Sequence, residues 1–264
     1  MTPATPAPEE LAAIARSVAV EAGQLLLAAW RTRPQTTEKA SNDLVTAHDL
    51  ASEHLILARL REATPGLPIV GEETGGHAQH AEPTWYCDPL DGTTNFVHGH
   101  PCWAVSLGIL HQGVPLAGAV AAPALGVAWH GSTPGGAYRA GTACQVSATL
   151  QLGDALVATG FPPDRRSSPA NNIDTFARVL PAVRGARRCG SAAIDCCLVA
   201  DGTYDAYWER RLHPWDLAGG CAVALAAGAT LTALDGSPPD LTIGNICLSN
   251  GHLHPQLLPL IGPS

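Results

Sequence analysis

The sequence predicts a layered α/β fold, and three observations lead to this prediction. The chain has 264 residues, of which 46% are hydrophobic, so it can bury a substantial core. Apolar residues recur at helical spacing over residues 11–30 and 46–63. Short apolar runs bounded by Gly and Pro alternate with helical segments along the rest of the chain. Strands that alternate with helices are typical of layered α/β proteins.

The remaining elements are expected in a regular order. The first helix ends before Pro34, and the second ends at the turn Thr64-Pro65-Gly66. Apolar runs and helical patterns predict strands at 67–70, 85–87, 104–110, 117–122, 127–129, 155–159 and 204–208, and helices at 173–180, 191–200 and 216–227. Glycines at 131–141 indicate turns near a boundary. We therefore expect an N-terminal half at 1–140 and a C-terminal half at 141–264, as one large domain or two closely packed ones.

The charge of the chain limits its expected partners. The net charge is -8 and the pI is near 5.7, which argues against a basic surface for nucleic acid. No apolar run approaches the roughly 20 residues that cross a bilayer. Residues 1–10 lack the positive start and apolar core of a signal peptide. We expect a cytoplasmic protein with a small ligand, no membrane and no nucleic-acid partner.

The cysteines and histidines do not predict a zinc site. The eight cysteines are scattered in mostly apolar surroundings without paired zinc spacing, so free buried thiols are expected. The pairs His98–His100 and His252–His254 lie beside Gly or Pro without a complementary ligand cluster. We expect these four to be surface histidines.

Two aspartates mark the first candidate site. Asp88 and Asp91 flank Pro89-Leu90, directly after an apolar strand and directly before Gly92. Carboxylates three residues apart in such a turn can converge on one point, where they repel each other unless a cation lies between them. Hard oxygen ligands favour Mg2+ over zinc. The alternative is a solvated acidic turn that caps the next helix.

The segment Gly92-Thr93-Thr94-Asn95 predicts an anion-binding turn. Its glycine lets the backbone approach a ligand closely, and its hydroxyl residues stand at a helix start. The free N–H groups and the helix dipole at such a start favour phosphate. Paired carboxylates beside a phosphate cradle indicate metal-assisted phosphoryl transfer.

Further acidic residues extend the site in the N-terminal half. Glu72 and Glu73 follow a predicted strand, where one carboxylate can join the metal cluster and the other brace it. The alternative for these two is a surface acidic pair. Asp43 and Asp49 lie around a turn that enters the second helix, where Asp43 or Thr46 can equally cap the helix.

The C-terminal half supplies more candidates. Asp216 starts an apolar helix, and a capping role there leaves its other carboxylate oxygen for a metal. Gly190, Ser191 and Ala192 put small residues at a helix start, which suits close approach by a polar substrate. Glu209, at the end of a strand, can accept hydrogen bonds from substrate hydroxyls.

These motifs resemble those of the inositol monophosphatases. D-P-L-D-G-T-T-N-F, G-E-E-T, D-L-V-T-x-x-D and W-D-x-A-G stand in the family's order and spacing from about Leu11 to Leu248. Residues 158–162 and 187–195 are similar to the bacterial SuhB-type members. The resemblance implies an α/β/α/β/α sandwich, usually a homodimer, with two to three Mg2+ ions per subunit.

The resemblance also implies a set of metal ligands. Glu72, Asp88 and the backbone carbonyl of Leu90 would hold the first metal. Asp88, Asp91 and Asp216 would hold the second, and Glu72 would share a third. The basic residue that the family carries near the metals would be Lys39.

Catalytic and substrate-binding roles follow from the same resemblance. Thr93, hydrogen-bonded to Asp49, would orient the attacking water together with Glu72. Two groups of residues would contact the substrate, namely Leu90, Asp91, Gly92 and Thr93 at the phosphate, and Asp91, Gly190, Ser191, Ala192 and Glu209 at the sugar-like part.

The implied activity is that of a phosphoric monoester hydrolase. Metal-activated water would hydrolyse a small phosphorylated polyol, with myo-inositol 1-phosphate as the expected substrate. Fructose 1,6-bisphosphate, 3'-phosphoadenosine 5'-phosphate and histidinol phosphate stay open as substrates. The run Thr94-Asn95-Phe96 is similar to inositol phosphatases, since the adenosine-phosphate group often has Lys-Glu-Phe there.

A second function class stays open. SuhB-type members are associated with the transcription machinery, so the chain can be a regulatory binding protein. Its contact surface would come from a group of arginines, which can equally form surface ion pairs, namely Arg184, Arg187, Arg188, Arg210 and Arg211.

Overall fold

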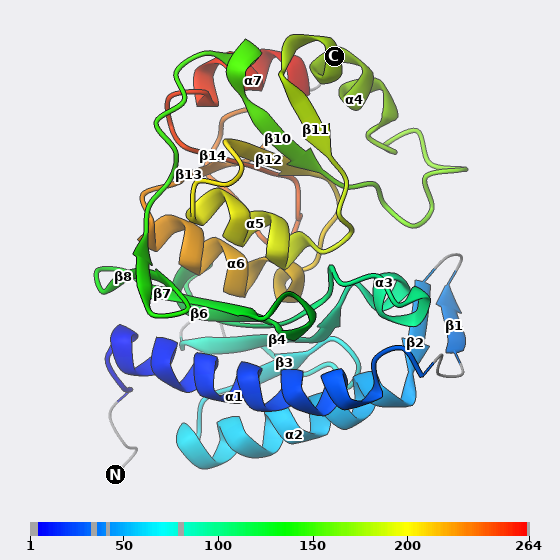
Figure 1. Cartoon of the computed structure of the whole chain (residues 1–264). Helices are drawn as coiled ribbons and strands as arrows, with labels where there is room; N and C mark the ends of the chain where they lie inside the picture. Colours follow the sequence, from blue (N-terminus) through cyan, green and yellow to red (C-terminus); the bar gives the residue numbers. More distant parts are fainter. Residues whose placement is uncertain (1–4, 33–35, 41–42, 79–81, 263–264) are drawn as a thin grey trace.

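The computed structural model shows the expected sandwich of alternating helix and sheet layers (Figure 1). It describes residues 5–32, 36–40, 43–78 and 82–262, and the side chains of residues 38–40 and 43 also lie outside the description. The roles suggested for the side chains of Lys39 and Asp43 therefore fall outside the described residues. Two helices cover a seven-stranded sheet, two more separate it from a five-stranded sheet, and another two cover the far side.

The seven-stranded sheet places the predicted acidic residues together. Its order is β3-β4-β5-β6-β7-β8-β9, and only the β3–β4 pair is parallel. The strands are β3 (Ile69–Gly71), β4 (Thr84–Asp91), β5 (Ala104–His111), β6 (Val114–Ala122), β7 (Val127–Ser132), β8 (Gly136–Arg139) and β9 (Thr142–Cys144). Because Gly71 is in register with Cys87, the residues that follow β3 lie beside the end of β4.

Two long helices cover one face of this sheet. They are α1 (Pro8–Ala29) and α2 (Ala47–Ala63). With a mean hydropathy of 1.5, α1 is apolar enough to cross a membrane by length and composition, so the expectation that no such run exists was wrong. Its apolar stripe, which includes Leu11, Val18 and Leu26, is buried in the core against the sheet. This burial within the protein accounts for its hydropathy.

The C-terminal half contributes the central and far layers. Helices α5 (Ala192–Ala200) and α6 (Pro214–Ala226) lie between the sheets, while α4 (Ile173–Val179) and α7 (His254–Ile261) lie beyond the second sheet (Figure 1). The second sheet has the order β11-β10-β12-β14-β13. Its strands are β10 (Leu156–Thr159), β11 (Gly185–Arg187), β12 (Ala206–Glu209), β13 (Thr230–Thr232) and β14 (Ile246–Ser249).

The two halves share a core. Helices α5 and α6 come from the C-terminal half, yet α6 packs on β5, β6 and β7 of the first sheet. The first sheet ends with β9 at Cys144, and the second begins with β10. A division into residues 1–140 and 141–264 stays a prediction.

The sequence did not predict several short elements. They are the hairpin β1 (Thr36–Ala40) and β2 (Asp43–Thr46), the strands β8, β9, β11, β13 and β14, the helix α7, and the 3-10 turns η1 (Pro123–Leu125), η2 (Leu152–Asp154) and η3 (Leu180–Ala182). The helix start expected after Gly92 is confirmed by the short helix α3 (Thr93–His98). His254 was expected at the surface but is 7% exposed. Its ring nitrogens lie 2.8 Å from Ser249 Oγ and 2.9 Å from Thr232 Oγ1. Hydroxyls on the two adjacent strands therefore satisfy the buried ring.

Glycines set the spacing between α6 and the first sheet. A Cβ added to Gly108 on β5 would lie 2.2 Å from the backbone carbon of Ala218, and one added to Gly118 on β6 would lie 2.8 Å from Gly219. A backbone cannot move aside as a side chain can, so only glycine fits. The helix consequently contacts the strands backbone to backbone.

We predict that Gly108→Ala will lower the free energy of unfolding by about 3 kcal/mol, since the new methyl group would force α6 away from the sheet. Denaturant unfolding measures this loss. Gly153→Ala is the control, because an added Cβ there meets no atom within 4 Å. Equal stability of the two variants would contradict the close packing of α6 on β5.

Candidate active site

Acidic residues meet where β3 and β4 end. The backbone N–H of Glu72 donates to the Cys87 carbonyl at 3.1 Å, which places Glu72 next to Asp88. Asp88 is 2% exposed, and its Oδ1 accepts from the backbone N–H of Leu90 at 2.9 Å. The strand continues through Asp91 instead of ending at Cys87 as expected, with an irregularity in the pairing between Asp88 and Asp91. Because of this irregularity, the alternation of side chains in a regular strand does not apply between Asp88 and Asp91.

The predicted phosphate cradle is a left-handed turn followed by a short helix. Gly92 has φ 90° and precedes α3, which begins at Thr93. A Cβ at Gly92 would lie 3.0 Å from the carbonyl oxygens of both Cys102 and Gly190. Both the positive φ and this close approach require glycine. The turn therefore presents its backbone to the site without a side chain in the way.

Thr93 and Asp49 form the hydrogen bond that the resemblance implied. Thr93 Oγ1 lies 3.1 Å from Asp49 Oδ1 and 3.1 Å from the Leu90 carbonyl oxygen, two acceptors for one hydroxyl proton. Asp49 Oδ2 accepts from Thr46 N at 2.8 Å and from Thr46 Oγ1 at 2.6 Å, so Thr46 caps α2 as one alternative proposed. Because Thr93 Oγ1 donates its one proton, its lone pairs can accept from a water.

Asp91 connects the cradle to the start of α5. Its Oδ2 accepts from Ser191 Oγ at 2.6 Å and from the backbone N–H of Ala193 at 2.8 Å. Ser191 also caps the helix, since its Oγ accepts from Ile194 N at 3.3 Å. A carboxylate at a helix N-terminus is favoured by the helix dipole. Ser191 and Ala192, both predicted to contact substrate, are thus held beside Asp91.

Asp216 and Glu209 lie at the same meeting of the two halves. Asp216 Oδ2 accepts from the backbone N–H of His213 at 2.7 Å and caps α6, which leaves Oδ1 for another ligand. Glu209 is 9% exposed, and its Oε2 accepts from Tyr207 Oη at 2.6 Å. Burial raises the pKa of Glu209 to about 7, although the hydrogen bond from Tyr207 and the charge of Arg188 lower it.

Four carboxylates influence one another at this point. Burial raises the pKa of Asp88 well above its usual range, and the charges of Glu72, Asp91 and Asp216 raise it further. The pKa of Asp216 is raised by burial and by the charges of Asp91 and Glu72. Burial raises the pKa of Asp91 to about 6, although hydrogen bonds from Ser191 and Ala193 lower it. The structure therefore brings together the side chains of Glu72, Asp88, Asp91 and Asp216 that the sequence predicted.

Within the part of the chain that the structure describes, no three His, Cys, Asp or Glu side chains are arranged to hold a metal ion as they stand. Some of their oxygens are turned toward backbone or hydroxyl donors, as at Asp88, Asp91 and Asp216. The predicted metal ligands lie in the same region, and their negative charges repel one another. That they coordinate an ion stays a prediction.

Comparison with known proteins identifies the family. The model of the inositol monophosphatase family matches residues 7–263. An inositol-1-monophosphatase of Synechocystis is 39% identical over 246 residues, which cover 92% of this chain and 86% of that protein. A putative Nus factor SuhB of Neisseria meningitidis serogroup B is 37% identical over 243 residues, 91% of this chain and 93% of its own.

The chain belongs to the inositol monophosphatase family. The solved inositol monophosphatase of Anabaena (Nostoc) superposes with a TM-score of 0.87 at 37% identity, covering 96% of this chain and 95% of its own. The predicted sandwich and the family resemblance are both confirmed. Like its family, the chain is a phosphoric monoester hydrolase.

The sequence predicted no role in the site for Ser52, Glu53 or Arg188, and for Asn95 it predicted only a place in the anion-binding turn. Glu53 on α2 is fully buried, and its two oxygens accept from the backbone N–H groups of Glu73 and Thr74 at 2.8 Å each. The hydroxyl of Ser52 donates to the Pro89 carbonyl at 2.9 Å. Both residues are buried, and nothing in this polar helical stretch marks them as such.

Asn95 and Arg188 act from the other side of the site. Asn95 Nδ2 lies 2.6 Å from the Cys102 carbonyl oxygen and 2.8 Å from that of Cys189, and Asn95 belongs to the same motif as Asp91. Arg188 lies over Gly190, where an added Cβ would be 2.4 Å from Arg188 Nη1. Its charge lowers the pKa values of Asp91 and Glu209. The sequence suggested only a contact surface or a surface ion pair for Arg188, which is indeed exposed, and did not predict this effect on the site.

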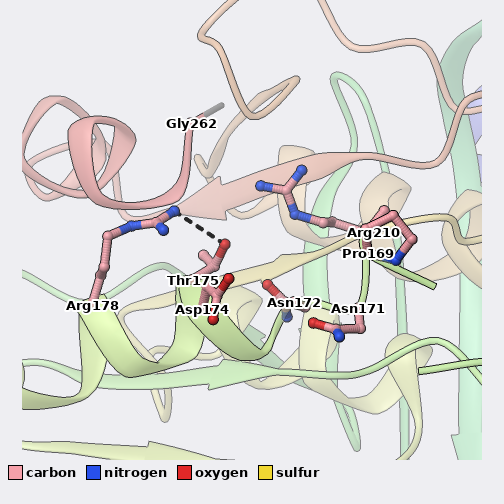
Figure 2. A pocket seen from close by; sticks show the side chains of 9 residues that line it. Pro169, Asn171, Asn172, Asp174, Thr175, Arg178, Arg210 and Gly262 are labelled. Atoms are coloured by element: carbon pink, nitrogen blue, oxygen red, sulfur yellow. Dashed lines mark hydrogen bonds between the residues drawn. The ribbon is translucent and has the colours of Figure 1, made fainter. Parts of the chain in front are cut away.

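A separate cavity of about 170 Å³ lies between α4 and the end of α7 (Figure 2). Arg178 and Arg210 line it, and Arg178 Nη2 donates to Thr175 Oγ1 at 3.2 Å. None of the predicted catalytic, metal or substrate residues contributes to its lining. It is therefore not the site of the phosphatase chemistry.

We predict that Glu53→Gln will reduce phosphatase activity and lower the free energy of unfolding by about 2 kcal/mol, because an amide NH2 would face a backbone N–H that the carboxylate now satisfies. Loss of this brace frees the Glu72 turn. Steady-state kinetics and denaturant unfolding measure both effects. The exposed Glu62→Gln is the matched control, and wild-type kinetics in Glu53→Gln would rule out the brace.

We predict that protein stability in chelator-containing buffer declines as the pH rises from about 4.5 to about 7. Glu209 is usually ionised above 4.5, but in the fold it stays protonated up to about 7, so the folded state loses free energy as the unfolded carboxyl ionises. Glu209→Gln should remove about 3 kcal/mol of this decline. The exposed Glu82→Gln should leave it unchanged. A decline of equal size in both variants would contradict a raised pKa at Glu209.

Proposed function

We propose that the chain hydrolyses a small phosphorylated polyol, myo-inositol 1-phosphate, in a Mg2+-dependent reaction with two to three ions per subunit. The observation that carries the proposal is the meeting of four carboxylates with the glycine turn at Gly92. The charges of these carboxylates raise one another's pKa values because they lie close together. The glycine turn beside them exposes backbone N–H groups at a helix start, which suits a phosphate.

The donor set fits Mg2+. Carboxylate and carbonyl oxygens are its preferred ligands, and a buried like-charged cluster gains most from a cation. Glu72, Asp88 and the Leu90 carbonyl would hold one ion, and Asp88, Asp91 and Asp216 another. When bound, such ions lower the pKa of a coordinated water and neutralise charge on the phosphate.

The residues of the chain position the reactants. Thr93 Oγ1 donates its hydrogen bond to Asp49 or to the Leu90 carbonyl, and its lone pair then orients a water together with Glu72. Asp49 is kept in place by Thr46 and lies 1% exposed, so water does not compete for it. The backbone of Gly92 and Thr93 would receive the phosphate.

Substrate contacts would come from the C-terminal half. Ser191 and Asp91 are joined by a 2.6 Å hydrogen bond, so a sugar hydroxyl that reaches Asp91 also meets the start of α5. Gly190 and Ala192 leave room there. Glu209, with a pKa of about 7, can accept or donate a hydrogen bond to a hydroxyl near neutral pH. Several relatives are named inositol-1-monophosphatase, which supports a polyol phosphate.

The test is a comparison of kcat/KM on four substrates with and without Mg2+. We expect myo-inositol 1-phosphate to exceed fructose 1,6-bisphosphate, 3'-phosphoadenosine 5'-phosphate and histidinol phosphate. Activity should vanish after chelation and return with Mg2+. A higher kcat/KM on one of the other three substrates would change the proposed substrate but not the proposed reaction. Undiminished activity after chelation would overturn the metal mechanism.

We predict that Asp91→Asn will leave the fold intact and reduce kcat by a factor of about 10³ or more, because one amide would replace a ligand shared by metal and substrate. An amide oxygen can still accept from Ser191 and Ala193, so α5 keeps its contact. Phosphate release and a thermal melt measure the two effects. Exposed Asp154→Asn is the control, and near-wild-type turnover in Asp91→Asn would remove this residue from the site.

A regulatory binding role is the second candidate, and relatives named Nus factor SuhB favour it. Two of the five candidate arginines form surface ion pairs, Arg184 with Asp154 and Arg211 with Asp164. Arg187 and Arg188 are the other exposed candidates. Recovery of RNA polymerase by the Asp91→Asn protein would support binding. We propose a homodimer in the cytoplasm for both functions, to be checked by light scattering and cell fractionation.

A further inference from the structure

Two cysteines lie together directly behind the phosphate cradle. Cys102 follows α3 and Cys189 precedes α5, so they come from different halves of the chain. One amide group, Asn95 Nδ2, lies 2.6 Å from the carbonyl oxygen of Cys102 and 2.8 Å from that of Cys189. A hydrogen bond also joins their two side chains. Both residues are partly exposed.

The surroundings of Cys189 favour its thiolate. Its Sγ lies 3.2 Å from Tyr204 Oη, and the charges of His100 and Arg187 also act on it. The hydrogen bond with Cys102 is the largest of the effects that lower its pKa to about 6. Burial raises the pKa of Cys144 to about 11, and the remaining five cysteines are buried. All eight cysteines belong to the described residues, so Cys189 is distinct among them.

We propose that Cys189 and Cys102 form a peroxide-sensitive pair that closes a disulfide behind the phosphate cradle and lowers the activity of the enzyme. The Cys189 thiolate attacks one oxygen of hydrogen peroxide, an S–O bond forms, the O–O bond breaks and hydroxide leaves. The Cys102 sulfur then attacks the Cys189 sulfur, which forms the S–S bond. The S–O bond breaks, and water leaves with the proton of Cys102.

The disulfide would disturb the site through Gly92 and Gly190. A bonded sulfur pair is about 2 Å apart, closer than a hydrogen-bonded pair, so the two segments must move toward each other. Gly92 is already packed against the carbonyl oxygens of Cys102 and Gly190, at 3.0 Å from its would-be Cβ. Ser191, two residues after Cys189, holds Asp91. Because catalytic geometry tolerates little displacement, we expect kcat/KM to fall about tenfold or more.

The test treats the full-length reduced protein with hydrogen peroxide and follows its intact mass, its cysteine-linked peptides and its kcat/KM. We expect loss of two hydrogens, a peptide that joins Cys102 to Cys189, and lower activity that dithiothreitol restores. Cys102→Ser should lack the disulfide and trap a Cys189 sulfenic acid that dimedone labels. Cys189→Ser should resist inactivation. Cys144→Ser is the matched control and should behave as the wild type.

Three results would overturn the proposal. They are the absence of a Cys102–Cys189 peptide in the wild type, a disulfide without change in activity, and inactivation of Cys189→Ser at the wild-type rate. The change in activity rests on the proposed phosphatase function, but the linked peptide does not. A linked peptide in a protein without phosphatase activity would therefore reject the proposed function alone. Thermal melts of the reduced variants exclude misfolding as the cause.

Discussion

The hydrogen bonds between Asp91 and the start of α5 join the two halves of the molecule at the site of its chemistry. Ser191 and Ala193 satisfy one carboxylate oxygen, and the same carboxylate lies in the cluster with Asp88 and Asp216. A buried carboxylate without such donors would be protonated or displaced. The fold can therefore keep this charge only while α5 is docked, which makes the architecture of the site dependent on the packing of the halves.

Burial of like charges is a cost that the rest of the structure offsets. Backbone N–H groups from Leu90 and His213 each satisfy one oxygen of a clustered aspartate, and glycine contacts hold α6 against the sheet beneath them. These contacts fix the carboxylates from behind while leaving their mutual repulsion in place. Such retained repulsion is typical of functional sites, since a core under no other constraint would exclude the charges.

Sequence reasoning predicted those features that depend on local pattern. The two long helices, the strands β3 to β7 and the segment from Asp88 to Asn95 follow from periodicity and from chemistry confined to neighbouring residues. It did not predict the short strand β11, whose Gly-Ala-Arg has no apolar alternation and pairs only because β10 lies beside it. Glu53 was missed for a related reason. Glu53 accepts a hydrogen bond from the backbone of Glu73, twenty residues later. A pattern among neighbouring residues cannot predict a contact over that sequence separation.

The apolar helix α1 has a consequence for how the chain reaches this fold during synthesis. It is made first, but the strands that bury its face, β5 to β7, are complete only at Ser132. Until then its leucine and alanine stripe has no partner from the sheet. Long-range contacts of this kind slow folding and leave intermediates prone to aggregation. The nascent chain therefore carries an apolar helix face that the sheet cannot cover until residue 132 has been synthesised.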